Sequence, residues 1–344
     1  MSCHTDLLIK WYDEHKRVMP WRDVTDPYAT LVSETMLQQT QVATVIPYYL
    51  RFITCFPTVF NLANATDDAL LKIWEGLGYY NRVINLKKAA QYIVENHQGI
   101  IPNDIHELLK INGIGAYTAG AILSIAYQLP YPAVDGNITR VLSRLYGIRS
   151  LSNEKKTKKQ VLAYADSMVK HKRPGDVNQA LMDLGATICI SGTPICHACP
   201  LQSYCDANKT GDAANLPKKP AKAKPISVYI NVSVITRDGY VLVAKRNESM
   251  LRGMYVFILE DQSRNENELL EYLTEMGISC QYEVLLGYAK HTFTHRKWHM
   301  TIHHFKALSA KCPPDTQWAL IEDLSVLPFP SAMHAALIYA KQLL

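Results

Sequence analysis

Four cysteines that lie close together in the chain have types and spacing that could do chemistry. Cys189, Cys196, Cys199 and Cys205 form a C-x6-C-x2-C-x5-C pattern that holds half of the eight cysteines. Four thiolates can bind one zinc ion or a 4Fe-4S cluster. Zinc knuckles usually pair two C-x2-C units, and this pattern, with one such unit and longer arms, does not match them. The other thiols are scattered, and we expect them to be small buried or incidental residues: Cys3, Cys55, Cys280 and Cys312.

A glycine turn and an aspartate form a second candidate site. Within Leu108–Ala121, two short helical runs flank Asn112-Gly-Ile-Gly115, and consecutive N–H groups in such a turn can bind a phosphate. A tight turn that only packs two helices together would use the same residues, so the turn alone does not show that a phosphate binds there. Twenty residues after Gly115, Asp135 opens the next predicted helix, where aspartate is also a good N-cap. The segment therefore offers a phosphate site and a carboxylate, each with a structural alternative.

Helices must position these residues, because the first 207 residues have helical patterning. Leu7, Leu8 and Trp11 have amphipathic spacing in a first helix that Pro20 ends. Glycines and prolines separate the segments that follow. We predict further helices over 28–54, 67–74, 82–97, 104–110, 116–127, 137–146, 155–171 and 176–188.

The pattern changes at a segment rich in lysine and proline. Residues 215–225 keep no apolar period and predict a semi-rigid, solvated linker, either a plain tether or a strip that lies along DNA. Beyond it, Ser227–Thr236 alternates, Asp238-Gly239 predicts a tight turn, and Tyr240–Ala244 completes a β-hairpin. The remaining elements complete an α+β domain: a helix near 265–276, a strand region near 282–307 and a short helix over 331–343.

Length and charge limit the possible functions. A chain of 344 residues usually divides into two domains. The formal net charge of +5 permits a polyanionic partner without proving one. We see no secretory signal, and the apolar stretch Thr118–Val134 is too short and too broken to span a bilayer, so we expect no membrane association. A cytoplasmic location follows as the expectation, and there clustered cysteines more often bind metal than form disulfides.

The glycine turn, the aspartate and the cysteine spacing together resemble the helix-hairpin-helix DNA glycosylases of base excision repair. The cysteine spacing is that of the iron–sulfur loop in the endonuclease III and MutY branch, and the matches run in order over residues 10–207. The resemblance implies an all-α helix-hairpin-helix glycosylase fold with a 4Fe-4S cluster, followed by an α+β Nudix-like domain. The implied boundaries are a catalytic domain 1–207, with hairpin 108–121 and iron–sulfur loop 189–205, a linker 208–226 and a lesion-recognition domain 227–344.

Three places favour the adenine glycosylase (MutY) branch, the third of them being the C-terminal domain described below. Pro20-Trp-Arg22 and Ser33-Glu-Thr-Met-Leu-Gln-Gln-Thr-Gln41 resemble its signature, in which Glu34 matches the catalytic glutamate. Tyr117 stands where the bifunctional endonuclease III branch has its nucleophilic lysine, and a tyrosine cannot form a Schiff base with deoxyribose. The resemblance therefore implies a monofunctional glycosylase that removes adenine mispaired with 8-oxoguanine or guanine.

Other functions stay open at this point. One is a bifunctional pyrimidine glycosylase and AP lyase of the endonuclease III type, which Tyr117 and the second domain oppose. Another is a DNA-damage binding protein without catalysis, which the presence of both Glu34 and Asp135 opposes. A third is a nucleotide pyrophosphatase acting through the second domain.

The second domain resembles the Nudix-like domain that this family uses to sense 8-oxoguanine. Its best match is His291-Thr-Phe-Thr-His295, where the family usually has Phe-Ser-His at the positions of Phe293, Thr294 and His295. The histidines at 291, 295, 299 and 303 recur every four residues, but their neighbours alternate with period two, so we predict a strand and no metal site. A Nudix magnesium box keeps only Glu271 and Glu275. Other residues replace the rest of the box: Val256, Gln262, Leu270 and Thr274.

The resemblance also implies a mechanism. Glu34, in a largely apolar pocket with a raised pKa, would protonate the adenine, and Asp135 would stabilise the positively charged sugar. Tyr117 and Asn137 match positions that support the acid and the developing charge. We expect a monomer that binds double-stranded DNA in the cytoplasm of a bacterium, associated with its nucleoid. Phosphate contacts are expected also from the basic runs Lys155–Lys159 and Lys170–Arg173. The residues expected to contact DNA are Arg22, Gln39, Thr40, Leu77, Tyr79, Asn112, Gly113 and Gly115.

Overall fold

The computed structural model describes residues 3–221, 224–261 and 264–343, which form two compact units. One unit comprises Met1–Asn64 and Asn85–Ala221, and the other combines Ala65–Ile84 with Lys222–Leu344. The sequence did not indicate that residues 65–84 group with the C-terminal residues. Among the residues described, no helix is both long and apolar enough to cross a membrane.

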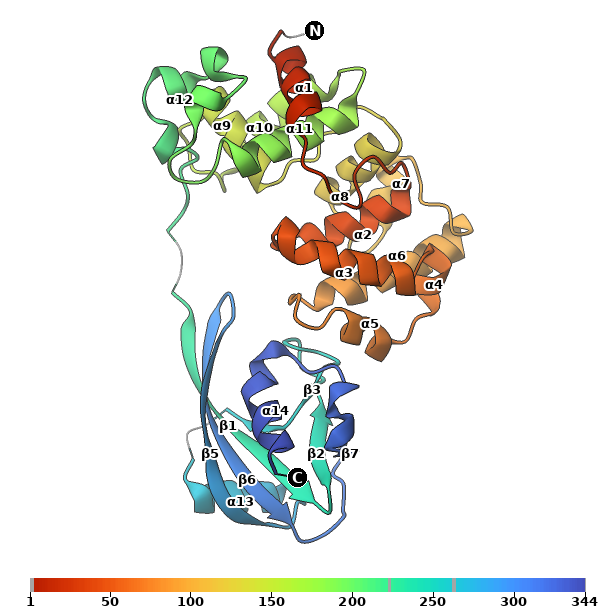
Figure 1. The fold of residues 1–344 in the computed structure, drawn as a ribbon, viewed down its shortest axis with the longest axis vertical. Coiled ribbons are helices and arrows are strands. Elements are labelled where there is room, and N and C mark those ends of the chain that lie inside the picture. Colours follow the sequence, from red (N-terminus) through yellow and green to blue (C-terminus); the bar gives the residue numbers. More distant parts are fainter. Residues whose placement is uncertain (1–2, 222–223, 262–263, 344) are drawn as a thin grey trace. The chain divides into compact units, whose positions relative to one another are not determined.

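The first unit is built from helices, as predicted (Figure 1). Apolar positions at helical spacing on α1, α9, α10 and α11 form one core, which includes Leu8, Leu142 and Val177. Its helices are α1 (Cys3–His15), α2 (Pro27–Leu37), α3 (Val42–Cys55), α4 (Val59–Asn64), α6 (Asn81–His97, which starts in the second unit), α7 (Ile105–Lys110), α8 (Ala116–Ala121), α9 (Gly136–Leu145), α10 (Lys155–Val169), α11 (Pro174–Thr187) and α12 (Asp206–Lys209). A π-helical turn covers Ile122–Ala126, and 3-10 turns cover Cys196–Ala198, Gln202–Tyr204 and Ala213–Asn215.

Helix α2 is the most deeply buried of the helices near the candidate site. Asp26 caps its start by accepting a hydrogen bond from the backbone N–H of Tyr28, and every residue from Tyr28 to Met36 is buried. The single helix predicted over 28–54 is wrong, because the chain leaves the helix after Leu37 and restarts as α3 at Val42. Gln39 in this break has a left-handed φ of 58°, and no glycine or proline there signals the break. The helix predicted over 116–127 likewise divides into α8 and the π-helical turn.

The backbone of α8 lies against the segment that leads to Asp135. A Cβ on Gly120 would lie 2.2 Å from the carbonyl oxygen of Pro132, which is backbone and cannot swing aside. We expect Gly120→Ala to destabilise the protein by about 1–3 kcal/mol in denaturant unfolding, because overpacking must displace one of the two chains. Gly136→Ala is the matched control, since a Cβ there meets nothing within 4 Å. Equal stability of the two variants would contradict this close approach.

The second unit contains a seven-stranded mixed sheet with strand order β3-β2-β1-β6-β5, in which β4 also pairs with β1 and β7 with β2. β1 and β6 run parallel over eleven paired positions, from Ile226 opposite Arg296 to Thr236 opposite Lys306, and β5 lies antiparallel to β6. The strands are β1 (Ile226–Arg237), β2 (Tyr240–Lys245), β3 (Tyr255–Val256), β4 (Ile258–Glu260), β5 (Cys280–Thr292), β6 (Arg296–Ala307) and β7 (Thr316–Leu320).

Helices cover both faces of this sheet (Figure 1). α14 (His334–Lys341) packs on the apolar face that contains Trp298 and Ile302, and α13 (Glu266–Glu275) packs on the face that contains Phe305. The unit also contains α5 (Asp67–Ile73) and short 3-10 turns at Glu322–Ser325 and Ser331–Met333. The α+β prediction is therefore confirmed.

The predicted hairpin is also confirmed. Asp238 and Gly239 both have positive φ, 49° and 81°, which suits the tight turn between β1 and β2. The strand region predicted near 282–307 corresponds to two strands, β5 and β6, joined by a short turn at Phe293–His295. The short strands β3, β4 and β7 and helix α4 carried too few residues for their periodicity to be recognised.

The solvated linker predicted over 215–225 is wrong in its first part. Leu216 is only 2% exposed and packs with Ala207 and Ala213. Lys218 forms an isolated parallel bridge with Leu151, and Ala221 still belongs to the first unit. Residues 222–223 of this prediction lie outside the described residues. The apolar side chain at Leu216 therefore anchors the start of this segment on the helical unit.

Candidate active site and cysteine loop

Glu34 is a buried carboxyl group on α2. Its relative exposure is 5%, and burial raises its pKa to about 7, an effect that a hydrogen bond from Tyr117 partly offsets and the charge of Asp135 adds to. The raised pKa expected from the sequence is confirmed. Glu34 therefore holds its proton up to near-neutral pH, as a general acid must.

Tyr117 lies in the first turn of α8 and donates its hydroxyl hydrogen to Oε2 of Glu34. Burial and the nearby carboxyl groups of Glu34 and Asp135 hold the pKa of Tyr117 well above its usual value, so the phenol stays protonated. A proton that Glu34 delivers is therefore carried by its other oxygen, Oε1. The glycine turn predicted at 112–115 thus places the hydroxyl of Tyr117 in hydrogen-bond contact with the carboxyl group of Glu34.

Asp135 is the N-cap of α9, as predicted. Its Oδ1 accepts a hydrogen bond from the N–H of Ile138 at 2.7 Å, and its Oδ2 accepts one from Nδ2 of Asn137 at 2.7 Å. The pKa of Asp135 is raised above its usual value, because burial outweighs these hydrogen bonds, which favour the ionised form. The charge of Asp135 raises the pKa of Glu34, so the two carboxyl groups interact within one site.

Arg140 connects this site with the cysteine loop. Its guanidinium donates to Oδ1 of Asn137 at 2.8 Å, to the carbonyl of Gly185 at 2.6 Å and to the carbonyl of Cys189 at 2.7 Å. A Cβ on Gly185 would lie 2.7 Å from Cβ of Asn137, so α11 and α9 approach closely here. The sequence did not single out Arg140, because an arginine on a helix usually faces solvent.

The four predicted cysteine ligands all lie within the first unit, between the end of α11 and the start of α12. Each is half-buried, and burial is the main cause that raises the pKa of Cys199 to about 12, with a smaller contribution from the other three cysteines. Within the described part of the chain, no group of three or more His, Cys, Asp or Glu side chains is close enough for one metal ion. The four thiols, which can supply four thiolate ligands, are nevertheless held in one loop.

A buried cation next to these sulfurs supports an anionic group in the loop. Arg144 is 2% exposed, and it donates to Sγ of Cys189 at 3.3 Å and to the carbonyl of Ile190 at 2.8 Å. No carboxylate of the described chain forms an ion pair with it. Burying an uncompensated charge costs several kcal/mol (about 3–5 when a partner is lost), so negative charge on the four thiolates fits this position.

Several residues predicted to contact DNA have the exposure that such a role requires. Gln39, Asn112, Gly113 and Gly115 are exposed, and Thr40 is half-buried. Gly113 has a left-handed φ of 88°, which explains the glycine in the hairpin turn.

Arg22 and Leu77 were also expected to contact DNA, but both side chains are buried. Leu77 is 6% exposed. Arg22 is 8% exposed and forms an ion pair with Asp183 of α11, which also accepts from Arg17 at 2.6 Å. Burial alone would raise the pKa of Asp183, but its bonds to the two arginines hold it below its usual value. Neither Arg22 nor Leu77 offers its side chain to a phosphate on the surface, because packing and the ion pair hold both inside.

The two basic runs differ in how their charge is compensated. In Lys170–Arg173, Lys170 pairs with Asp166 at 2.7 Å and Arg173 with Asp13 at 2.6 Å. The lysines of Lys155–Lys159 are exposed at the start of α10, and no ion pair of the described residues includes them. Of the two runs, the exposed lysines of 155–159 are therefore the better candidates for the expected phosphate contact.

In the second unit, the predicted lesion-recognition residues occupy the β5–β6 turn. Phe293 packs edge-on against Trp298 at 5.0 Å, whereas Thr294 and His295 are exposed. Oγ1 of Thr294 lies 3.0 Å from the hydroxyl of Tyr79, which is itself 48% exposed. The structure thus brings together one residue predicted to read the lesion and one predicted to contact DNA.

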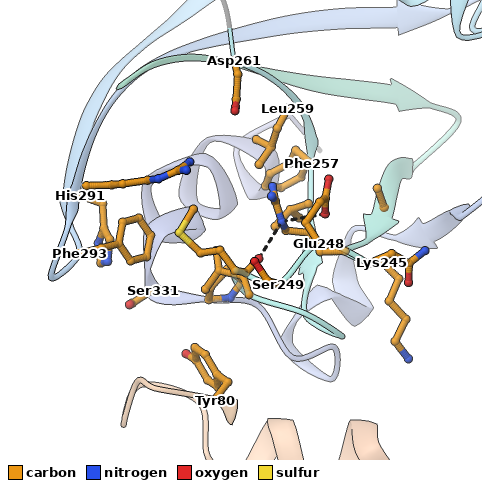
Figure 2. A pocket seen from close by; sticks show the side chains of 18 of the residues that line it. Tyr80, Lys245, Glu248, Ser249, Phe257, Leu259, Asp261, His291, Phe293 and Ser331 are labelled. Atoms are coloured by element: carbon orange, nitrogen blue, oxygen red, sulfur yellow. Dashed lines mark hydrogen bonds and ion pairs between the residues drawn. The ribbon is translucent and has the colours of Figure 1, made fainter. Parts of the chain in front are cut away.

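These residues line an open cavity of about 1300 Å³ in the second unit. Figure 2 shows Phe293 and His291 on one side, Glu248 and Ser249 on another, and Phe257 and Leu259 between them. Of the Nudix box, Val256 is buried in the core and the two retained glutamates are exposed on α13, while Gln262 lies outside the described residues.

Comparison with known proteins decides the family. Residues 32–166 match the HhH-GPD superfamily of base excision DNA repair proteins, and residues 231–339 match the NUDIX domain. The adenine DNA glycosylase of Buchnera aphidicola subsp. Baizongia pistaciae is 35% identical over 292 residues, which cover 84% of this chain and 82% of that protein. The chain belongs to the adenine DNA glycosylase family. The human adenine DNA glycosylase is 31% identical, and the match covers 95% of this chain and 72% of the human protein. The Arabidopsis thaliana adenine DNA glycosylase is 36% identical, and the match covers 78% of this chain but only 50% of the plant protein.

Solved structures agree with the fold expected of an adenine DNA glycosylase family member. A thermostable thymine-DNA glycosylase is 26% identical and superposes with a TM-score of 0.56, over 60% of this chain and 95% of its own. A trapped endonuclease III–DNA covalent intermediate, 23% identical, superposes with a TM-score of 0.52 over 60% of this chain and 94% of its own. The predicted helix-hairpin-helix glycosylase fold with a C-terminal Nudix-like domain is therefore confirmed.

Proposed function

We propose that this protein hydrolyses the N-glycosidic bond of adenine mispaired with 8-oxoguanine or guanine in double-stranded DNA. It acts as a monomer in the bacterial cytoplasm. The observation that carries the proposal is the buried Glu34, whose pKa of about 7 lets it hold a proton near neutral pH, in the same site as Asp135 with its hydrogen-bond donors. Family membership supports adenine as the base.

Base removal begins with a proton from Glu34. Adenine leaves poorly as an anion, so Oε1 gives its proton to a ring nitrogen and the bond between that base and C1′ breaks with adenine neutral. The hydrogen bond from Tyr117 to Oε2 fixes the plane of the carboxyl group and stabilises the carboxylate that remains. The base has to leave the duplex first, which costs a few kcal/mol and least at a mispair.

Asp135 acts on the sugar. As the bond to adenine breaks, the sugar gains oxocarbenium-like positive charge, which a nearby carboxylate stabilises. The N–H of Ile138 and the amide of Asn137 hold the carboxylate of Asp135 in place, and Arg140 holds Asn137. Water then adds to C1′ and gives its proton to the Glu34 carboxylate, which leaves free adenine and an abasic site.

Strand cleavage is not part of this activity. A lyase forms a Schiff base with the opened sugar and needs an amine nucleophile. The hydroxyl of Tyr117 occupies that position in this chain, and it is committed to Glu34.

The second unit supports recognition of the oxidised partner base. Thr294 is exposed at the β5–β6 turn beside Tyr79, and the dismantled Nudix box favours a recognition module over a pyrophosphatase. Because one lost hydrogen bond is worth about 1 kcal/mol, Thr294→Ala should reduce the preference for 8-oxoguanine over guanine about fivefold. Single-turnover excision from the two mispairs measures this preference. Thr292→Ala, at an exposed threonine two residues earlier, is the control, and an equal loss in both variants would count against Thr294.

We infer that the cysteine loop holds a 4Fe-4S cluster bound by Cys189, Cys196, Cys199 and Cys205. When bound, such a cluster supplies a rigid, negatively charged anchor for the loop. Cys199→Ser should abolish most of the iron and sulfide content and the brown colour, because one of the four ligands is lost. Cys55→Ser, at an exposed cysteine, should keep both. A colourless wild-type protein that contains zinc would overturn the cluster.

The decisive experiment is single-turnover cleavage of a duplex with adenine opposite 8-oxoguanine, with and without subsequent alkali. Strand breaks that appear only after alkali are expected from a monofunctional glycosylase. Breaks without alkali would favour the endonuclease III type of activity. Bound but intact DNA under both conditions would favour a damage-binding protein without catalysis. A duplex with a normal A:T pair is the control substrate.

A further inference from the structure

A half-buried arginine, Arg140, and a buried one, Arg144, reach the same cysteine, but only Arg140 is linked to a carboxylate that offsets its charge. Arg140 and Arg144 both donate to the carbonyl of Cys189, at 2.7 and 3.2 Å. The charge of Asp135 stabilises the cationic form of Arg140, to which it is linked through Asn137. Among the described residues, Arg144 forms no ion pair with any carboxylate.

The guanidinium of Arg144 is enclosed by acceptors from the cysteine loop and from the segment that follows it. Nε donates to the carbonyl of Leu216 at 2.8 Å, and the two terminal nitrogens donate to the carbonyls of Ile190 at 2.8 Å and Gly192 at 3.1 Å. These carbonyls satisfy its hydrogen bonds but carry no net charge. A fully buried cation needs an anion as well, since desolvation of an unpaired charge is costly.

The remaining polar partner of Arg144 is a sulfur. One terminal nitrogen lies 3.3 Å from Sγ of Cys189, and the backbone carbonyl of Arg144 lies 3.4 Å from Sγ of Cys205. The residue is therefore in contact with two of the four candidate ligands. A cluster bound by four thiolates is an anion, and it would stand where the charge of Arg144 is not otherwise offset.

We propose that Arg144 is the counter-cation of the cluster and that its charge sets the cluster's reduction potential and its resistance to oxidative loss. This inference rests on the cluster assigned above. Positive charge and a hydrogen bond at a ligand sulfur both favour the more reduced state of an iron–sulfur cluster, so they raise its reduction potential. Arg144 acts through the cluster and the loop around it, so it is a positioning residue and does not touch the DNA.

Arg149, which follows α9 in the chain, provides a matched comparison. It also reaches the segment after Cys205, where it pairs with Asp206 at 2.8 Å and Asp212 at 3.5 Å. Its side chain is 43% exposed, and no hydrogen bond of the described residues joins it to a cysteine sulfur. Replacement of Arg149 therefore removes an arginine that contacts the segment after Cys205, but it removes no positive charge that is hydrogen-bonded to a cysteine sulfur.

The test measures iron content, reduction potential by voltammetry and the rate of iron loss under ferricyanide, on the purified full-length protein. Arg144→Met should lower the potential and lose iron about tenfold faster or more than wild type, because a buried partner charge is gone. Arg144→Lys keeps the charge and should stay close to wild type in potential, and Arg149→Met should match wild type in both.

Each outcome decides a separate point. Wild-type protein without iron would overturn the cluster itself, whatever Arg144 does. Iron-loaded Arg144→Met with the potential and iron-loss rate of Arg149→Met would overturn the role of Arg144 alone. If Arg144→Met does not fold, Arg144→Lys decides. A potential near wild type supports charge compensation, whereas a lowered potential shows that the shape of the guanidinium, not its charge, is what the loop requires.

Discussion

Replacing Glu34 with glutamine is expected to reduce the single-turnover rate of adenine excision by about 10²–10⁴-fold, the usual contribution of a positioned general acid. Glutamine fills the same space on α2 and still accepts a hydrogen bond from Tyr117, but it carries no proton to deliver. Binding to DNA with an adenine:8-oxoguanine mispair should persist. Glu95→Gln, at an exposed glutamate of α6, is the control and should excise normally.

The pH dependence of the wild-type enzyme follows from the same residue. Because the pKa of Glu34 is raised to about 7, the active protonated form is lost as the pH rises through 7, so excision should fall on the alkaline side. Stability should change in the same direction. Folding favours protonated Glu34, so its contribution is complete below the usual glutamate pKa and is lost as the pH rises through about 7. Normal excision by Glu34→Gln, or a rate that does not fall above pH 7, would refute the assignment of Glu34 as the acid.

Replacing Asp135 with asparagine is expected to lower excision by about 10²–10³-fold, the size of effect seen when one electrostatic stabiliser of a transition state is removed. Asparagine is as good an N-cap as aspartate, so α9 should keep its capped start and the protein should fold. The loss therefore reports the missing negative charge.

A second measurement on Asp135→Asn tests how the two carboxyl groups are coupled. The charge of Asp135 raises the pKa of Glu34, so its removal should move the alkaline limb of the residual activity to lower pH. Asp104→Asn is the matched control, since Asp104 caps α7 in the same way but is exposed. An equally large loss in the Asp104 variant would point to the cap rather than to the charge, and an unmoved alkaline limb would show that the two sites are independent.

The residues of the candidate active site could be predicted because the family resemblance picks them out and two of them also carry a local signal. Asp135 begins a helix after a proline-containing segment, and Tyr117 follows a glycine turn that must reverse the chain. The burial and raised pKa of Glu34 were expected from the family resemblance. The geometry confirms that these three residues share one site, and their catalytic roles stay predictions.

The supporting charges could not be predicted, because their partners are far away in the sequence. Asp183 is 161 residues from Arg22, and Cys189 is 45 residues from Arg144. An arginine in a helical pattern has the same appearance whether it faces water or a buried carbonyl. For the same reason Leu77 was expected to be accessible and is instead packed, since sequence position alone does not show which side of a loop faces the interior.

The predicted helix boundaries are wrong where the backbone leaves the α-helical conformation without a glycine or proline at the break. The break after Leu37 and the π-helical turn after Ala121 both lie in runs of helix-forming residues, where tertiary packing overrides local preference. The prediction of a solvated linker is wrong in its first part because the many lysines and prolines of this segment hid the signal of its single buried leucine.

The left-handed backbone at Gln39, with φ 58°, and at Tyr79, with φ 50°, limits how stable this protein can become. Each such residue costs about 1 kcal/mol or more relative to glycine, a cost that the folded protein bears before any DNA is present. Selection for heat resistance alone would favour glycine at both positions. Because Gln39 and Tyr79 are both expected to contact DNA, those same substitutions would produce a more stable protein that recognises damage less well. A relative adapted to higher temperature would therefore have to gain its stability at other positions of the chain.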